Sequence, residues 1–120
     1  QRTWEHRRAE ALYRQTLAIE PGHVRALNNL GVLYMDAQKT EEAMAMFGKA
    51  IVLKRDYADP YYNLACLYAR KKEIDESLWY LKVAMTISNE VKDWVMKDAD
   101  MEHVVASPLF KKMMEGQKNR

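Results

Sequence analysis

The feature that most constrains this chain is a recurrence of residue types at an offset of about 34 residues. Identical residues stand at this offset in the middle of the chain: Asn29 and Asn63, Leu30 and Leu64, Tyr34 and Tyr68, Ala50 and Ala84. Toward the start of the chain, Ala9 precedes Ala43 and Tyr13 precedes Phe47 at the same offset. Such a period indicates stacked helical hairpins, because a single hairpin cannot bury its apolar face and must pack on its neighbours.

The central repeat, Val24 to Tyr57, carries a motif that can be compared with known repeats. The motif consists of Leu27, Leu30, Gly31 and Tyr34, followed by Ala43 and Phe47. It resembles the W-x2-L-G-x2-Y…A-x3-F pattern of the tetratricopeptide repeat family, with Leu27 in place of Trp. The resemblance implies an all-α fold, a right-handed superhelical solenoid of helical hairpins, that serves as a protein-binding scaffold and is not an enzyme.

Small and large residues alternate along the repeats in a way that predicts how the helices pack. Small residues are expected where the two helices of a hairpin cross: Gly31, Ala43, Ala50, Ala65 and Ala84. Large residues are expected between neighbouring repeats: Tyr13, Leu30, Tyr34, Phe47, Leu64, Tyr68 and Leu81. Gly48 is interpreted as a surface glycine rather than as a point of close backbone approach.

The repeat divides the chain into four parts. Residues 1–23 are predicted to be the second helix of a truncated repeat, 24–57 and 58–91 two complete repeats, and 92–120 capping helices and a tail. The periodicity stops after Asn89, because no Leu-Gly pair follows Trp94. We expect the chain to be a fragment of a longer protein and its last part to be the cap that solenoids require.

Capping residues and helical spacing predict the helices themselves. Two caps are expected inside the repeats, Thr40 before the second helix of the central repeat and Asp59 before a helix that starts at Pro60. Asp98, Asp100 and Ser107 are expected to cap short helices in the last part. The predicted helices are Trp4–Ile19, Val24–Ala37, a helix from Glu41 to Leu53, Pro60–Arg70, Ile74–Ser88, Glu90–Lys97, a helix from Ala99 or Asp100 to Val105, and Pro108–Met114.

Composition excludes several functional classes. The net charge of +2, from 19 basic and 17 acidic residues, gives no broad footprint for nucleic acid. No apolar run approaches the roughly 20 residues of a membrane span, so we expect no direct membrane insertion. The single Cys66 cannot form an internal disulfide. No compartment is assigned: the cytoplasm is favoured, and a periplasmic or membrane-anchored parent protein stays open.

The family resemblance also implies a site, a groove on the concave side lined by the first helix of each hairpin. The central repeat would contribute Arg25, Asn28, Asn29, Val32, Met35 and Asp36. The next repeat would contribute Asp59, Tyr62, Asn63, Cys66, Ala69 and Arg70. This groove would hold a peptide or a segment of a partner protein.

Asn29 and Asn63 occupy the groove position at which peptide-binding members of the family use an amide. An amide can donate to a backbone carbonyl and accept from a backbone N–H at once, so a ladder of them can hold an extended chain. An Asn at this position without any ligand is the alternative, and the sequence does not decide between them. The basic residues that clamp a terminal carboxylate are replaced by Asp59 and Asn63, so we predict no tight binding of an acidic C-terminal tail.

No catalytic, metal or cofactor site is predicted. Cys66 and the histidines His6, His23 and His103 stand in separate elements, and none of their neighbours would activate a thiol. The cluster of Asp98, Asp100, Glu102 and His103 lacks the ligand spacing of a zinc or calcium site. Asp98 and Asp100 are better explained as helix caps.

Two alternatives to the adaptor function stay open. The first is a structural role in which the apolar ends of the fragment form a homo-oligomer through Trp4, Leu12 and Tyr13, because uncovered apolar surface tends to find a partner. The second is a regulatory segment of a larger enzyme whose catalytic domain lies outside this sequence.

Overall fold

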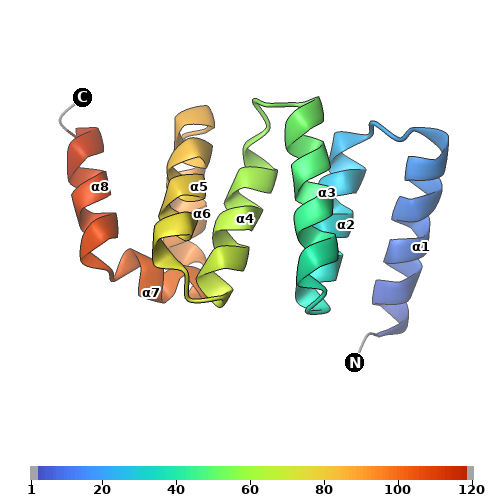
Figure 1. Ribbon diagram of the computed structural model, residues 1–120, viewed down its shortest axis with the longest axis horizontal. Coiled ribbons are helices and arrows are strands. Elements are labelled where there is room, and N and C mark those ends of the chain that lie inside the picture. Colours follow the sequence, from blue (N-terminus) through green and yellow to red (C-terminus); the bar gives the residue numbers. More distant parts are fainter. Residues whose placement is uncertain (1–2, 119–120) are drawn as a thin grey trace.

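A computed structural model describes residues 3–118, and helices are the only regular structure in that range. The first five are α1 (Trp4–Ile19), α2 (Val24–Asp36), α3 (Thr40–Leu53), α4 (Ala58–Arg70) and α5 (Ile74–Ile87). They are followed by α6 (Val91–Lys97), the 3-10 turn η1 (Ala99–Met101), α7 (Glu102–Val105) and α8 (Pro108–Lys118). The helices form one elongated row, with α1 at one end and α8 at the other (Figure 1). The all-α hairpin solenoid is confirmed, and the right-handed superhelix stays a prediction.

Two antiparallel hairpins, α2 with α3 and α4 with α5, form the centre of the row (Figure 1). Gly31 faces Phe47 so closely that a Cβ on Gly31 would lie 2.5 Å from the Phe47 ring. Phe47 is completely buried, as is its counterpart Leu81 in the second hairpin. Phe47 therefore packs inside its own hairpin as well as in the cluster that reaches α4, whereas it was predicted only between repeats. The small residues predicted at the crossings, Ala43, Ala50, Ala65 and Ala84, are all buried. Gly48 has no neighbour within 4 Å of its own Cβ position, which agrees with a surface glycine.

The turns inside the two hairpins repeat as closely as the helices do. Gln38 and Lys72 adopt the left-handed conformation, with φ of 62° and 64°. In each turn the next N–H donates back into the preceding helix, from Lys39 to the Tyr34 carbonyl at 2.8 Å and from Glu73 to the Tyr68 carbonyl at 2.9 Å. These bonds satisfy carbonyls that a helix end leaves free.

Two expected helix caps are wrong. Thr40 is the first residue of α3, and the cap position belongs to Lys39, whose side chain makes no capping bond. α4 begins at Ala58, one residue before Asp59, with Tyr57 at the cap position. Asp59 therefore lies in the first turn of α4, where a carboxylate is favoured by the helix dipole. The side chain that does cap α2 is the Nδ1 of His23, which accepts from the N–H of Ala26 at 3.1 Å.

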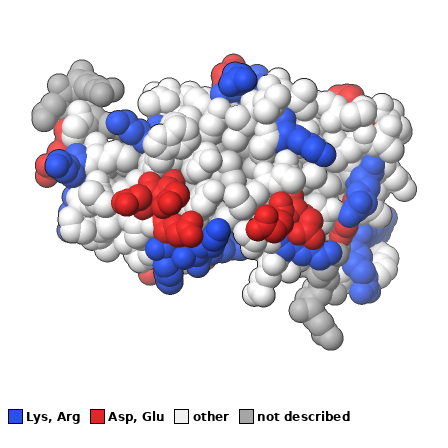
Figure 2. Space-filling view, in the orientation of Figure 1, with Lys and Arg blue, Asp and Glu red and all other residues white. Residues whose placement is uncertain are grey.

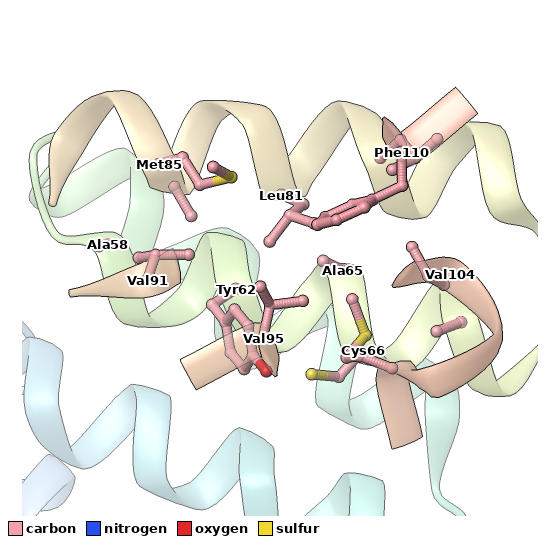
Figure 3. Packing of buried hydrophobic residues seen from close by; sticks show 14 residues of the cluster. Ala58, Tyr62, Ala65, Cys66, Leu81, Met85, Val91, Val95, Val104 and Phe110 are labelled. Atoms are coloured by element: carbon pink, nitrogen blue, oxygen red, sulfur yellow. The ribbon is translucent and has the colours of Figure 1, made fainter. Parts of the chain in front are cut away.

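The C-terminal helices cover one end of the stack. Apolar side chains from α6, η1, α7 and α8 join those of α4 and α5 in one cluster (Figure 3). The most deeply buried of these C-terminal residues are Val91, Val95, Met101 and Val104. Leu109 of α8 does not take part in this cluster and is 50% exposed. Asp98 and Ser107 cap as predicted, accepting from the N–H groups of Asp100 and Phe110.

The opposite end of the stack is much less covered. No residue of α1 is buried, although Tyr13 and Leu17 pack against the cluster of α2 and α3. Trp4 and Leu12 are 61% and 53% exposed.

The face of α3 and α5 carries acidic side chains near the lower ends of these helices, and large areas of it carry no charge (Figure 2).

Candidate peptide-binding face

The predicted groove residues lie on α2 and α4, the first helices of the two hairpins. In Figure 1, α2 lies behind α3, so the groove side of α2 faces away from the viewer. We call the surface made by the predicted groove residues the groove face. Its residues fall into three groups. Some bond to each other, some are covered by residues 94–103, which we call the C-terminal segment, and most of the rest are exposed to solvent or half-buried.

The first group links the two hairpins through a pair of amides. Asn63 Nδ2 donates to Asn28 Oδ1 at 2.9 Å, and the Asn28 side chain is buried. The amide of Asn63 therefore already has a structural partner. Asn29, one residue further along α2, is half-buried, and its side chain forms no hydrogen bond within residues 3–118.

The second group is covered by residues 94–103. Asp98 Oδ2 accepts from the Tyr62 hydroxyl at 2.8 Å and from Cys66 Sγ at 3.5 Å. Asp100 Oδ2 accepts from Arg70 at 2.8 and 3.1 Å. Tyr62, Cys66 and Arg70, three predicted groove residues, are thus engaged by the chain itself.

Further contacts involve the C-terminal segment and the end of α4. His103 Nε2 lies 3.0 Å from the Ala69 carbonyl. Arg70 also reaches Asp36 at the end of α2, at 3.3 Å, and so joins α4 to α2. Trp94 packs edge-on against Tyr62, with ring centroids 5.5 Å apart. These roles of Asp98 and Asp100 could not be predicted from the sequence, where both residues fit a helix cap or a metal ligand. Asp100 is an ion-pair partner of Arg70 rather than a helix cap.

The third group is exposed or half-buried, except for Met35. Arg25 is exposed, while Asn29, Val32 and Asp59 are half-buried. Met35 is buried and lines a separate depression with Asp36 and Arg70. A smaller depression of about 160 Å³ is lined by Asp59, Tyr62, Asn63 and Trp94, and we call it the aromatic pocket.

The environment of the groove face shifts several pKa values, and those of Cys66, Tyr62 and Asp59 bear on its chemistry. Burial raises the pKa of the Cys66 thiol, and the nearby Asp98 raises it further. Burial also raises the pKa of the Tyr62 hydroxyl. The pKa of Asp59 is raised because the carboxyl is partly buried, and Arg25 offsets only part of this effect. Since only a thiolate is a strong nucleophile, the shift at Cys66 works against thiol chemistry.

The histidines and carboxylates do not converge on a reactive centre in the part of the chain that the structure describes. His6 contacts Thr3, His23 caps α2, and His103 binds the Ala69 carbonyl. Among residues 3–118, no group of three or more His, Cys, Asp or Glu side chains is arranged to hold a metal ion. In the same range, no helix combines the length and the apolar character that crossing a membrane requires.

Comparisons with known proteins give consistent matches to one family. Models described as tetratricopeptide repeats match residues 5–51 and 58–90, and a further model described as a TPR repeat matches residues 33–72. The chain is 36% identical over 70 residues to Protein O-mannosyl-transferase TMTC3 of Homo sapiens, and 37% identical over 65 residues to the protein of that name from Mus musculus.

These matches cover 58% and 54% of this chain but only 8% and 7% of the two transferases. The chain therefore spans a small part of the curated relatives that it matches. Among solved structures, a crystal structure of MamA protein superposes with a TM-score of 0.65 at 25% identity. That superposition covers 84% of this chain and 54% of MamA.

Proposed function

Since the chain belongs to the tetratricopeptide repeat family, we propose that it binds a segment of a partner protein on the open part of its groove face, as an adaptor in a larger assembly. Membership of this family supports a role as a protein-interaction module, because the fold is in general a non-catalytic scaffold. The partner segment would lie against α2 and the start of α4.

The observation that carries this proposal is the division of the groove face. Tyr62, Cys66 and Arg70 are occupied by the C-terminal segment, whereas Arg25, Asn29 and Val32 are open or half-buried. The amide of Asn29 has no partner in the described chain, so it can donate to and accept from the backbone of a bound segment. Val32 supplies apolar surface beside it.

The test is capture of partner proteins from the native host by wild-type protein and by the double variant Arg25→Glu, Asn29→Ala. Both side chains lie outside the core, so the variant should fold. Asn63 is unsuitable for this test, because its removal would leave the buried Asn28 without its hydrogen bond. A charge reversal on the far side, Lys82→Glu on α5, is the matched control. Loss of a partner in the double variant alone supports the proposal, and equal capture by all three proteins contradicts it.

Self-association is a second candidate, supported by the exposure of α1. Trp4 and Leu12 present apolar surface at the uncovered end of the stack, and Tyr13, which follows Leu12, is half-buried. Homo-oligomerisation through these residues would cover this surface. Sedimentation equilibrium at rising protein concentration tests self-association. A dimer that dissociates to a monomer in the Leu12→Glu variant supports it, and a wild-type protein that stays monomeric at every concentration contradicts it.

A third candidate is a non-catalytic segment of a larger enzyme. It is favoured by the match to a short stretch of a transferase. Under this proposal the groove face would contact another part of the same protein. The sequence of the gene on either side of residues 1–120 tests it directly, since the absence of a catalytic domain there would contradict it.

A further inference from the structure

We propose that the aromatic pocket is a binding site for a cation, the side chain of a lysine or arginine in the partner segment. The inference rests on the proposed function, because it assigns one residue type of the partner that the groove face would hold. The pocket lies at the junction of α4 and α6 and is lined by Asp59, Tyr62, Asn63 and Trp94. Its chemistry and its size both select the ligand.

The negative charge in the pocket comes from Asp59. This carboxylate is partly buried and makes no ion pair with another residue of the described chain. Arg25 on α2 is the cation whose charge acts on it, but Arg25 also interacts with the Tyr57 hydroxyl, and Glu90 adds a second negative charge nearby. A partly buried carboxylate without an ion-pair partner is unfavourable. A cation entering the pocket would supply that partner.

The other walls also favour a positive ligand. Asn63 Nδ2 is used in the bond to Asn28, which leaves the Oδ1 of Asn63 as a hydrogen-bond acceptor. Tyr62 and Trp94 meet at an interplanar angle of 78°, so they present aromatic surface in two directions. Aromatic faces attract ammonium and guanidinium groups through their quadrupole. Charge, acceptor and ring surface therefore act together.

The size of the pocket limits the ligand to a single side chain. Its volume of about 160 Å³ is well below the roughly 300 Å³ at which small-molecule sites begin. An acidic side chain would be repelled by Asp59. An apolar side chain would remove water from the carboxylate without replacing its hydrogen bonds. The side chains of lysine and arginine can interact favourably with the carboxylate, the amide oxygen and the aromatic rings of the pocket together.

The experiment is an NMR titration of the protein with Nα-acetyl-lysine methylamide and with Nα-acetyl-arginine methylamide. The reporters are the indole N–H of Trp94 and the side-chain amide of Asn63. Nα-acetyl-norleucine methylamide is the uncharged probe of similar shape, and Nα-acetyl-glutamate methylamide carries the opposite charge. We expect saturable shifts with lysine, arginine or both, and none with the other two probes.

The variant Asp59→Asn keeps the shape of the side chain and removes its charge. It should weaken binding of the cationic probes about tenfold, as expected for loss of a partly desolvated cation–carboxylate contact. Glu76→Gln, which removes an exposed acid from the first turn of α5, is the matched control and should bind like wild type. Circular dichroism of both variants checks that they fold.

Two results would overturn the cation site: no saturable shift with either cationic probe, or equal binding by wild type and Asp59→Asn. Equal shifts with norleucine would overturn it as well, because they would identify a merely apolar pocket. None of these results depends on a partner protein. The adaptor proposal would then still stand or fall on the Arg25 and Asn29 double variant.

Discussion

At the scale of single residues, two glycines in one hairpin have opposite roles. Gly31 is required because the fully buried ring of Phe47 occupies the space where a Cβ would lie. Gly48 has open space around it and lies inside α3, where glycine is a poor helix former. The same substitution should therefore change stability in opposite directions at the two positions.

We predict that Gly31→Ala lowers the free energy of unfolding by about 1–3 kcal/mol, the usual cost of overpacking a core. Gly48→Ala should raise it by about 0.5–1 kcal/mol, because alanine loses less backbone entropy in a helix. Urea denaturation of the two variants and the wild type measures both effects. A Gly31→Ala protein as stable as wild type would mean that α2 and α3 cross elsewhere.

Asp59 gives a second prediction, which concerns pH. Burial raises its pKa in the folded state, so the folded protein holds this proton more tightly than the unfolded chain does. Stability therefore falls as pH rises from the ordinary aspartate pKa, about 3.9, through the raised value, and the penalty persists above it. Asp59→Asn should be more stable than wild type at pH 7, and the difference should vanish near pH 3. Thermal melts across this range test it, and a constant difference would contradict the raised pKa.

At the scale of helices, the sequence predicted elements better than contacts between them. Helical spacing and the signals at helix ends placed α1 to α5 to within two residues at either end, because both are local information. The caps at Thr40 and Asp59 were wrong, since Lys39 and Tyr57 adopt the extended or non-helical conformation before α3 and α4.

The contacts across the groove face could not be predicted in the same way. Asp98 and Asp100 meet Tyr62 and Arg70 only because the chain turns at the end of α6 and returns over α4. That turn lies where the repeat stops, so no periodic pattern specifies it. The open residues Arg25, Asn29 and Val32 were named from the family resemblance, and their use by a ligand stays a prediction.

Truncating equivalent side chains in α1 and α3 should lower the free energy of unfolding by different amounts, because α1 is less covered than α3. Phe47 is fully buried, so Phe47→Ala should cost about 3–5 kcal/mol. Tyr13, its counterpart in α1, is half-buried, and Tyr13→Ala should cost only about 1 kcal/mol because less apolar area is lost. Chemical denaturation of the two variants gives the comparison. Equal costs would show that something covers α1 in solution, and an unchanged stability for Phe47→Ala would show that the repeat register is wrong.

The C-terminal segment should control access to Cys66. The thiol is buried beneath Asp98, and its raised pKa keeps it protonated, so a disulfide reagent should react slowly with the native protein. Arg70→Ala removes the bonds to Asp100 and should speed labelling by up to about fivefold, which corresponds to ~1 kcal/mol for a partly exposed ion pair. Lys71→Ala, beside it at the end of α4, is the control. Equal labelling rates in the two variants would mean that Arg70 does not hold the segment closed.

At the scale of the whole molecule, coverage differs from one end to the other. One apolar cluster joins α4 and α5 to the C-terminal helices, and a second joins α2 and α3 to α1 and α4. α4 takes part in both clusters, whereas α1 contributes only half-buried side chains to one. In a stack where each unit touches only its neighbours, local stability follows local coverage. The row should therefore be most stable around α4 and least stable at α1.

Hydrogen exchange followed residue by residue measures this gradient. Amides of α1 should exchange first, through local opening at a free energy well below that of global unfolding, because no side chain of this helix is buried. Amides of α4 and α5 should exchange last. Repeating the experiment at higher protein concentration separates the two explanations of the exposed α1 surface: protection of α1 that rises with concentration means that a second copy covers it. Protection of α1 equal to that of α4 in the dilute protein would contradict the gradient itself.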